Sequence, residues 1–206
     1  HYDVWFGIQN KCLAKLIDTA IEEKKLNADL LIEYFEKNSW YGQAFKKKLT
    51  NQQDVEYKWL DFIEPSIRSY FYKMEECLRN KEPYYPLFIQ EIDSLTLKIE
   101  GLLRDLIERA KIEGFSTLKF CYDLNNKKIV QKKNINNFLW DKKLFEILSV
   151  DDVWFLRYLL IEQVNLRNDI AHCLFVTPKQ YHLHLFHNVL IAILRLSKFR
   201  VTNSTS

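Results

Sequence analysis

The residue types best suited to chemistry gather in one short stretch, Asn165-Leu166-Arg167-Asn168-Asp169-Ile170-Ala171-His172. On an ideal α-helix Asn168 and His172 are i,i+4 neighbours, and Arg167 lies about 100° round the axis from Asn168. One small site can therefore hold an imidazole that titrates near neutral pH, a permanent cation and an amide. This combination suits chemistry on a phosphate. In that interpretation His172 moves protons, Arg167 binds phosphate oxygens, and Asn168 orients His172 or donates to the phosphate.

The same residues also have a purely structural interpretation. Arg, Asn and His at a helix end often cap the last carbonyl groups and offset the helix dipole. We expect the stretch to close a helical segment that begins at Ser149 with Asp151 and Asp152 and continues through apolar residues. A polar cluster at the end of so apolar a segment must be satisfied or used, because burying it unpaired is costly.

We predict no metal and no cofactor. His182, His184 and His187 form a His-x-His-x-x-His pattern, but His182 and His184 would point about 200° apart on a helix, and no Cys or carboxylate set accompanies them. A phosphodiester can still be cut without metal if it belongs to RNA, because the 2′-hydroxyl is an internal nucleophile. The expected products are a 2′,3′-cyclic phosphate and a 5′-hydroxyl.

A second organising element is the long helix predicted over residues 87–112. One broad apolar face is expected to contain Ile92, Leu95, Ile99, Leu102, Leu103 and Leu106. Asp93, Glu100 and Arg104 fall within about 20° of one another on another face. They form either an ordinary surface pair, Glu100–Arg104, or a polar row that packs beside the Arg167/His172 end, where Glu100 holds a cation in position. Asp169 is counted with these supporting residues.

Two blocks of the chain, 93–106 and 165–172, resemble the HEPN superfamily. Arg167-Asn168-Asp169-Ile170-Ala171-His172 is similar to its Arg-x(4–6)-His signature, and Asp93-Ser94-Leu95-Thr96-Leu97-Lys98-Ile99-Glu100-Gly101-Leu102-Leu103-Arg104-Asp105-Leu106 resembles a poorly characterised bacterial branch. The resemblance covers residues 86–200. It implies a metal-independent endoribonuclease with the role of a toxin or antiviral defence effector, whose active site is completed across a homodimer. Leu174 stands where regulated family members carry a modified Tyr, so we do not expect that control.

Composition indicates an all-α protein. With 48% hydrophobic residues and only four Gly and four Pro among 206, the chain can bury a large core but has few turns. We predict a HEPN-like up-and-down bundle at 86–200, a helical N-terminal extension at 1–85, an inserted β-hairpin at 116–132 and a frayed tail at 201–206. In the extension we expect helices at 4–24, at 28–37 after an Asn27 cap, from Ser39 through Lys48, and at 55–80 with a bend at Pro65.

The inserted hairpin concentrates lysines: Lys119, Lys127, Lys128, Lys132 and Lys133. A protruding basic hairpin could bind an RNA backbone through its phosphates. A loop that is merely solvated by lysine explains the same pattern. The formal net charge of +3 is too small to indicate a nucleic-acid binder by itself, so any basic surface must be local.

The remaining sequence features concern the cellular location of the protein and whether it has further domains. Cys12, Cys77, Cys121 and Cys173 have no paired spacing, and we interpret them as small core residues in a reducing, cytoplasmic compartment. No apolar run is long enough for a membrane span. The chain does not begin with Met, so we expect further domains in the native protein. Three functions remain open: the endoribonuclease, a non-catalytic module that binds RNA or a nucleotide or dimerises a larger protein, and a purely structural helical domain.

Overall fold

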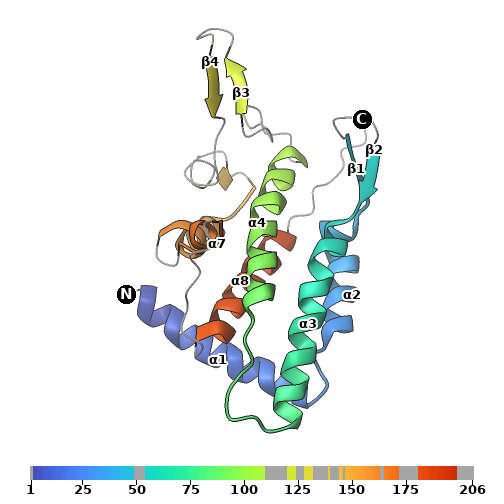
Figure 1. Cartoon of the computed structure of the whole chain (residues 1–206), viewed down its shortest axis with the longest axis vertical. Coiled ribbons are helices and arrows are strands. Elements are labelled where there is room, and N and C mark those ends of the chain that lie inside the picture. The colour runs from blue at the N-terminus through green and yellow to red at the C-terminus, as the bar shows by residue number, and fades with distance from the viewer. Residues whose placement is uncertain are drawn as a thin grey trace.

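The chain folds into a mostly helical structure (Figure 1). The computed structural model describes residues 2–48, 54–109, 120–123, 128–131, 139, 144–145, 147–162, 165–171 and 181–198. The α-helices in these ranges are α1 (Tyr2–Glu22), α2 (Ala28–Asn38), α3 (Trp59–Arg79), α4 (Ile89–Arg109), α6 (Val150–Arg157), α7 (Leu166–Ala171) and α8 (His182–Ser197). The all-α prediction is confirmed at this level. Within the described ranges, none of the helices has both the length and the apolar character required to cross a membrane.

Shorter elements complete the described chain. A 3₁₀ turn, η1 (Trp40–Gly42), follows α2, and a π-helical turn, η3 (Tyr158–Glu162), follows α6. Strands β1 (Phe45–Lys48) and β2 (Asp54–Tyr57) pair antiparallel, as do β3 (Phe120–Asp123) and β4 (Lys128–Gln131). The β3–β4 pair lies inside the 116–132 range of the predicted hairpin, and Figure 1 shows it projecting beyond the end of α4.

Helices α4 and α8 form the centre of the molecule. They pack on each other, α3 packs on α4, and α1 lies across α8 and α3 (Figure 1). The predicted apolar face of α4 is confirmed, since Ile92, Leu95, Ile99, Leu102, Leu103 and Leu106 are all fully buried. Burying such side chains contributes about 1.5–3 kcal/mol each relative to exposure, which is what holds the central pair together.

The first 85 residues contribute to the same hydrophobic core as the later helices. The indole of Trp40 donates to the Leu196 carbonyl at 2.9 Å, and the hydroxyl of Tyr41 donates to the Ile193 carbonyl at 2.6 Å. Both aromatic residues are buried, so these bonds satisfy their polar ends where water is excluded. The turn η1, which follows α2, is thereby fastened to α8. The division at residue 85 into extension and bundle stays a prediction.

Two predicted helix starts are confirmed by their caps. The Asn27 side chain accepts a hydrogen bond from the Leu30 amide at 2.9 Å, and α2 begins at the next residue. The Ser149 hydroxyl accepts from the Asp152 amide at 3.1 Å, and α6 begins at Val150. Each cap satisfies an amide that the helix itself leaves without a partner, which is why Asn and Ser mark helix starts in sequence.

The helix predicted from Ser39 through Lys48 is wrong. Ser39 does cap a turn, but the turn is the short η1, after which the chain enters β1. The register pairs Lys46 with Glu56 and Lys48 with Asp54, and opposite charges on facing strand positions favour this pairing. A Cβ at Gly42 would stand 2.6 Å from the Glu36 carbonyl oxygen, so only glycine allows the chain to fold back against α2.

Helix α3 also departs from its prediction. It begins at Trp59 because residues 54–57 form β2, and it continues through Pro65 without a restart. A proline removes one helical hydrogen bond, but the buried side chains on both sides of it hold the helix in place. Among the aromatic residues of α3, Trp59, Tyr70 and Phe71 are buried, whereas Phe62 and Tyr72 are exposed.

Candidate functional site

The predicted single helix from Ser149 to His172 is broken in the structure. Helix α6 passes into the π-helical η3, and α7 begins again at Leu166. Asn165, just before α7, has φ 49°, a left-handed conformation that Asn tolerates better than most residues. The signature therefore starts on a new short helix, and its direction is set at Asn165 independently of α6.

Asp169 has a local partner in this new helix. Its amide donates to the Asn165 carbonyl at 3.1 Å, and its carboxylate accepts from the Asn165 side chain at 3.3 Å. The pair thus stabilises the first turn of α7. This contact is structural. It occupies one carboxylate oxygen of Asp169, which was predicted to support the site.

Arg167 and Asn168 lie on α7, in the middle of its first turn. Their side chains are outside what the structure describes, and His172, the next residue after α7, is outside the described residues altogether. The structure therefore places the helix that carries the first two signature residues. The meeting of Arg167 with His172 stays a prediction.

Helix α4 is in contact with α7. On α4 the Arg104 guanidinium donates to one Glu100 oxygen at 2.7 and 3.2 Å. The predicted i,i+4 pair therefore forms, with side chains that are 13% exposed for Arg104 and 21% exposed for Glu100, and its packing beside the Arg167/His172 end stays a prediction. A largely buried ion pair is held more rigidly and screened less than a surface pair. The element that carries the polar row and the element that carries the signature do pack together.

Asp93, the third member of the polar row, is not hydrogen-bonded to Glu100 or Arg104 in the structure. Its Oδ1 is buried and finds no hydrogen-bond partner among the described residues. Burial raises the pKa of this carboxyl. Two apolar residues of α4 lie beside this polar row on the helix surface. Ile107 is buried, and Leu97 is 53% exposed.

The five lysines of the predicted RNA-binding hairpin are only partly placed. Lys128 starts β4, where the register pairs it with Asp123. Its side chain is not described, and Lys119, Lys127, Lys132 and Lys133 lie outside the described residues. A basic surface at the hairpin stays a prediction, and the one lysine whose backbone is described stands opposite an acidic residue.

The three α8 histidines face different environments. His182 and His187 are buried, and His184 is partly exposed. His187 Nε2 lies 2.7 Å from the Tyr70 hydroxyl, and burial, followed by the neighbouring His184, lowers the pKa of His187 to about 4. Burial and then Lys11 also lower the pKa of His184. Across the described ranges, three or more His, Cys, Asp or Glu side chains nowhere converge in a way that could hold a metal.

Two polar clusters in the structure were not predicted from the sequence. Glu91 is only 2% exposed and binds the Lys73 ammonium at 2.6 Å and the Ser69 hydroxyl at 2.5 Å. Burial raises the pKa of Glu91, but those two partners outweigh it and the pKa lies below the usual value. Asp152 receives the Arg195 guanidinium at 2.7 Å, which ties α6 to α8. Each ion pair joins two different helices, so no pattern within one helix marks it.

Cysteine placement corrects one further prediction. Cys77 is buried, as expected of a small core residue, but Cys12 is exposed on α1, and both are free thiols. Cys121 lies in β3 with its side chain undescribed, and Cys173 is outside the described residues.

Comparison of the chain with protein-family models, with curated proteins and with solved structures finds no match in any of the three.

Proposed function

We infer that this chain is a metal-independent endoribonuclease of the HEPN type. Arg167 binds the scissile phosphate, and His172 transfers a proton as the 2′-hydroxyl attacks phosphorus and the 5′-oxygen leaves. The observation that supports this most is the contact between α7, which carries the start of the signature, and α4, which carries the part-buried Glu100–Arg104 pair. The two blocks that resemble the family in sequence are thus neighbours in the fold.

The buried pair suits a supporting role at such a site. Glu100 and Arg104 are held in one geometry by two hydrogen bonds and by low exposure, so they present fixed charges on α4, the helix that packs on α7. Fixed charges in a partly desolvated place stabilise a developing negative charge better than mobile surface groups do. In this proposal Glu100 positions a guanidinium, its own Arg104 or the Arg167 of the site, and Asn168 orients His172.

The proposal extends to assembly and context. An RNA transesterification of this kind needs one group to remove the 2′-hydroxyl proton and another to protonate the leaving 5′-oxygen, and a second His172 from a homodimer partner completes the pair. A symmetric partner would also cover a polar cluster that follows an apolar segment. The products are a 2′,3′-cyclic phosphate and a 5′-hydroxyl, and the biological role is that of a toxin or defence effector in the cytoplasm.

The test is RNA cleavage in the presence of EDTA with the ends of the products identified. Wild type is compared with Arg167→Ala and His172→Ala. Arg68→Ala, which removes an exposed arginine of α3, and His184→Ala, which removes a partly exposed histidine of α8, serve as matched controls. We expect cleavage by wild type and both controls, cyclic phosphate ends, and a loss of about 10²–10⁴-fold in the two signature variants.

Other outcomes have definite meanings. Equal cleavage by all five proteins would contradict the assignment of Arg167 and His172. Binding of RNA without cleavage by wild type would support the non-catalytic module instead. Cleavage abolished by EDTA would contradict the metal-independent mechanism.

A further inference from the structure

Trp154 presents an aromatic ring to solvent on α6, the helix that leads to the signature. The residue is 44% exposed, whereas every other residue in the fully described stretch from Asp152 to Ile161 is buried or half-buried. The open indole is therefore a single feature of this stretch and does not belong to a generally exposed helix face.

The Arg157 guanidinium lies against one face of this ring, with its Cζ 4.5 Å from the ring centroid. Arg157 is only 4% exposed, and its Nε and Nη2 both donate to one Glu162 carboxylate oxygen, Nε at 3.0 Å. The cation–π contact and the ion pair together hold the indole in one orientation. Since the guanidinium covers one face while 44% of the residue is exposed, the opposite face is the open one.

The position of Trp154 connects it to the proposed active site. Helix α6 continues directly into η3, and η3 packs on α7, which carries Arg167 and Asn168. At a rise of 1.5 Å per residue, Trp154 stands about 12 Å along the helix from the end of η3. An RNA strand whose phosphate is bound at α7 can therefore reach the open ring with a nearby nucleotide.

Given the proposed ribonuclease function, on which this inference rests, we propose that the open face of Trp154 stacks on a base of the RNA strand that is cleaved, and that the substrate is unpaired RNA. Proteins bind single-stranded RNA largely by stacking its bases on aromatic rings, whereas a base within a duplex has both faces covered by its neighbours. A ring that Arg157 already holds in place loses little conformational freedom on binding. Trp154 thus supplies affinity for the strand while the residues of α7 act on the phosphate.

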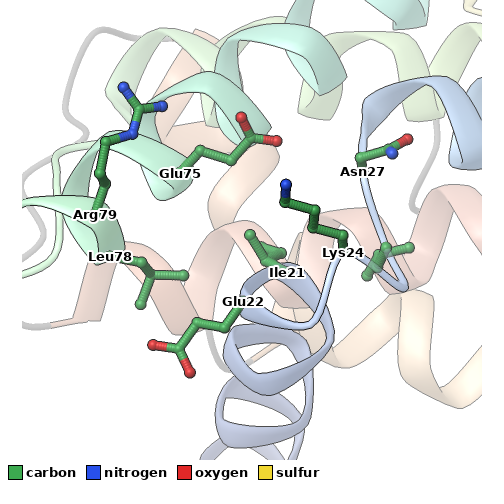
Figure 2. Close-up of a pocket in the computed structure, with 8 residues that line it drawn as sticks. Ile21, Glu22, Lys24, Asn27, Glu75, Leu78 and Arg79 are labelled. Atoms are coloured by element: carbon green, nitrogen blue, oxygen red, sulfur yellow. The ribbon is translucent and has the colours of Figure 1, made fainter.

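The pocket of about 450 Å³ at the corner of α1, α2 and α3 has a less organised lining (Figure 2). Its charged residues Glu22, Lys24, Glu75 and Arg79 are all exposed, and Figure 2 shows Glu22 and Arg79 directed away from Lys24 and Glu75. A ligand would have to order these side chains on binding, whereas the orientation of Trp154 is already fixed by Arg157.

The apolar surface around Trp154 is small for a protein partner. The exposed large apolar residues of this part of the described chain are Phe145, Val150 and Trp154, which are 41%, 56% and 44% exposed. Three partly exposed side chains provide far less than the roughly 800 Å² per partner that a stable protein interface buries. One open ring is enough, however, to stack on one base.

The first test measures binding without cleavage, by fluorescence polarisation. The probe is a pool of labelled single-stranded 2′-O-methyl RNAs of random sequence and about ten nucleotides, which lack the attacking hydroxyl. An abasic chain with the same phosphates and the same pool annealed to its complements are the comparators. We expect wild type to bind the single strands about tenfold or more tightly than either comparator, because only the single strands offer an open base face.

Variants at Trp154 separate stacking from covering. Trp154→Leu removes the aromatic face but keeps an apolar side chain over Arg157, and Trp154→Phe keeps a smaller ring. Phe62→Leu is the matched control, because Phe62 is also 44% exposed, has the Lys98 ammonium 5.8 Å from its ring centroid, and belongs to α3, which lies on the other side of α4 from α7 (Figure 1).

We expect Trp154→Leu to bind the single strands roughly ten- to a hundredfold more weakly than wild type, with Trp154→Phe between the two and Phe62→Leu equal to wild type. Binding of the abasic chain should be the same in all four proteins, because it depends on the phosphates alone.

Cleavage of unmodified RNA separates this inference from the proposed function. In Trp154→Leu we expect KM to rise by about the same factor as the dissociation constant while kcat stays unchanged, because a base that stacks equally before and during the reaction contributes to binding alone. A wild-type KM in this variant would overturn the stacking role and leave the ribonuclease proposal standing. Binding that depends on Trp154 without any cleavage would overturn the ribonuclease proposal and leave the stacking role standing.

Three further results would overturn the stacking role. They are no binding of the single strands by wild type, equal binding of single strands and duplexes, and equal binding by wild type and Trp154→Leu. Conversion of a dimer into a monomer by Trp154→Leu, measured by light scattering, would also overturn it, because the ring would then belong to a protein interface.

Discussion

Among the residues that the structure describes, the Tyr70–His187 contact and the Glu100–Arg104 pair withdraw polar side chains from solvent by different means. At the α3–α8 interface Tyr70 and His187 meet at 2.7 Å, both without exposed surface, beside Phe186, whose ring stacks on Tyr70 at 4.2 Å. On α4, Glu100 and Arg104 form an ion pair that keeps part of its surface exposed. The first cluster is neutral and closed, and the second is charged and partly open.

The contrast between these two clusters indicates which surroundings allow a histidine to transfer protons. His187 is enclosed by aromatic rings, its Nδ1 finds no hydrogen-bond partner in the described part of the chain, and burial lowers its pKa to about 4. It is therefore neutral at physiological pH and serves packing. Chemistry on a phosphate needs an imidazole that changes charge near neutral pH and that substrate can reach. The proposal that His172 acts on RNA therefore requires surroundings unlike those of His187.

The largest expected effect is on stability at the closed cluster. Tyr70→Ala removes a fully buried ring of α3 that packs against Phe88 and against Phe186 of α8. We expect this change to lower the free energy of unfolding by about 3–5 kcal/mol. Tyr72→Ala, two residues along the same helix and 64% exposed, should change it by less than about 0.5 kcal/mol. Urea denaturation measures both. Similar losses in the two variants would show that the cluster is not a core element.

The next effect is the pH dependence of the same cluster. The pKa of His187 is about 4 in the folded protein and 6.5 when unperturbed, so between these values the unfolded chain binds more protons. Stability should thus be full above pH 6.5 and fall as the pH drops toward 4, by up to about 3 kcal/mol from this group. His187→Gln cannot titrate, and its stability should fall less over that window. An unchanged pH slope in His187→Gln would refute the assignment.

The smallest effect concerns the open cluster. Glu100→Gln removes the carboxylate that binds the Arg104 guanidinium on α4, the helix that packs on α7. We expect RNA cleavage to slow roughly ten- to a hundredfold, because the guanidinium is then no longer held in position. Glu64→Gln disturbs a pair of the same i,i+4 spacing, Glu64–Arg68, on the more exposed surface of α3 and should leave cleavage unchanged. Equal rates in the two variants would remove Glu100 from the supporting set.

Much of the fold follows from local patterns in the sequence. The apolar face of α4, the Asn27 cap and the Ser149 cap depend on residues three or four apart, and each was predictable for that reason. The β1–β2 pair was missed because the tripeptide Lys46-Lys47-Lys48 reads as a helix end until its facing residues, Glu56 and Asp54, are known. Strand pairing depends on residues that are distant along the chain.

The candidate site shows the same limit. The helical spacing within Arg167–His172 and the polar row on α4 can be seen in the sequence, and so can their order. The restart of the chain at Asn165 could not be predicted, because it depends on a left-handed residue after a π-helical turn. The Tyr70–His187 contact joins residues 117 apart, and no pattern along the chain marks it.

The most direct measurement sets the two histidines side by side. RNA cleavage in EDTA and the melting temperature are determined for wild type, His172→Ala and His187→Ala, with cleavage assayed well below every melting temperature. We predict that His172→Ala loses cleavage by about 10²–10⁴-fold and keeps its melting temperature, whereas His187→Ala keeps cleavage and melts at a lower temperature. Cleavage by His172→Ala at the wild-type rate, or the absence of cleavage in wild type, would contradict the proposal.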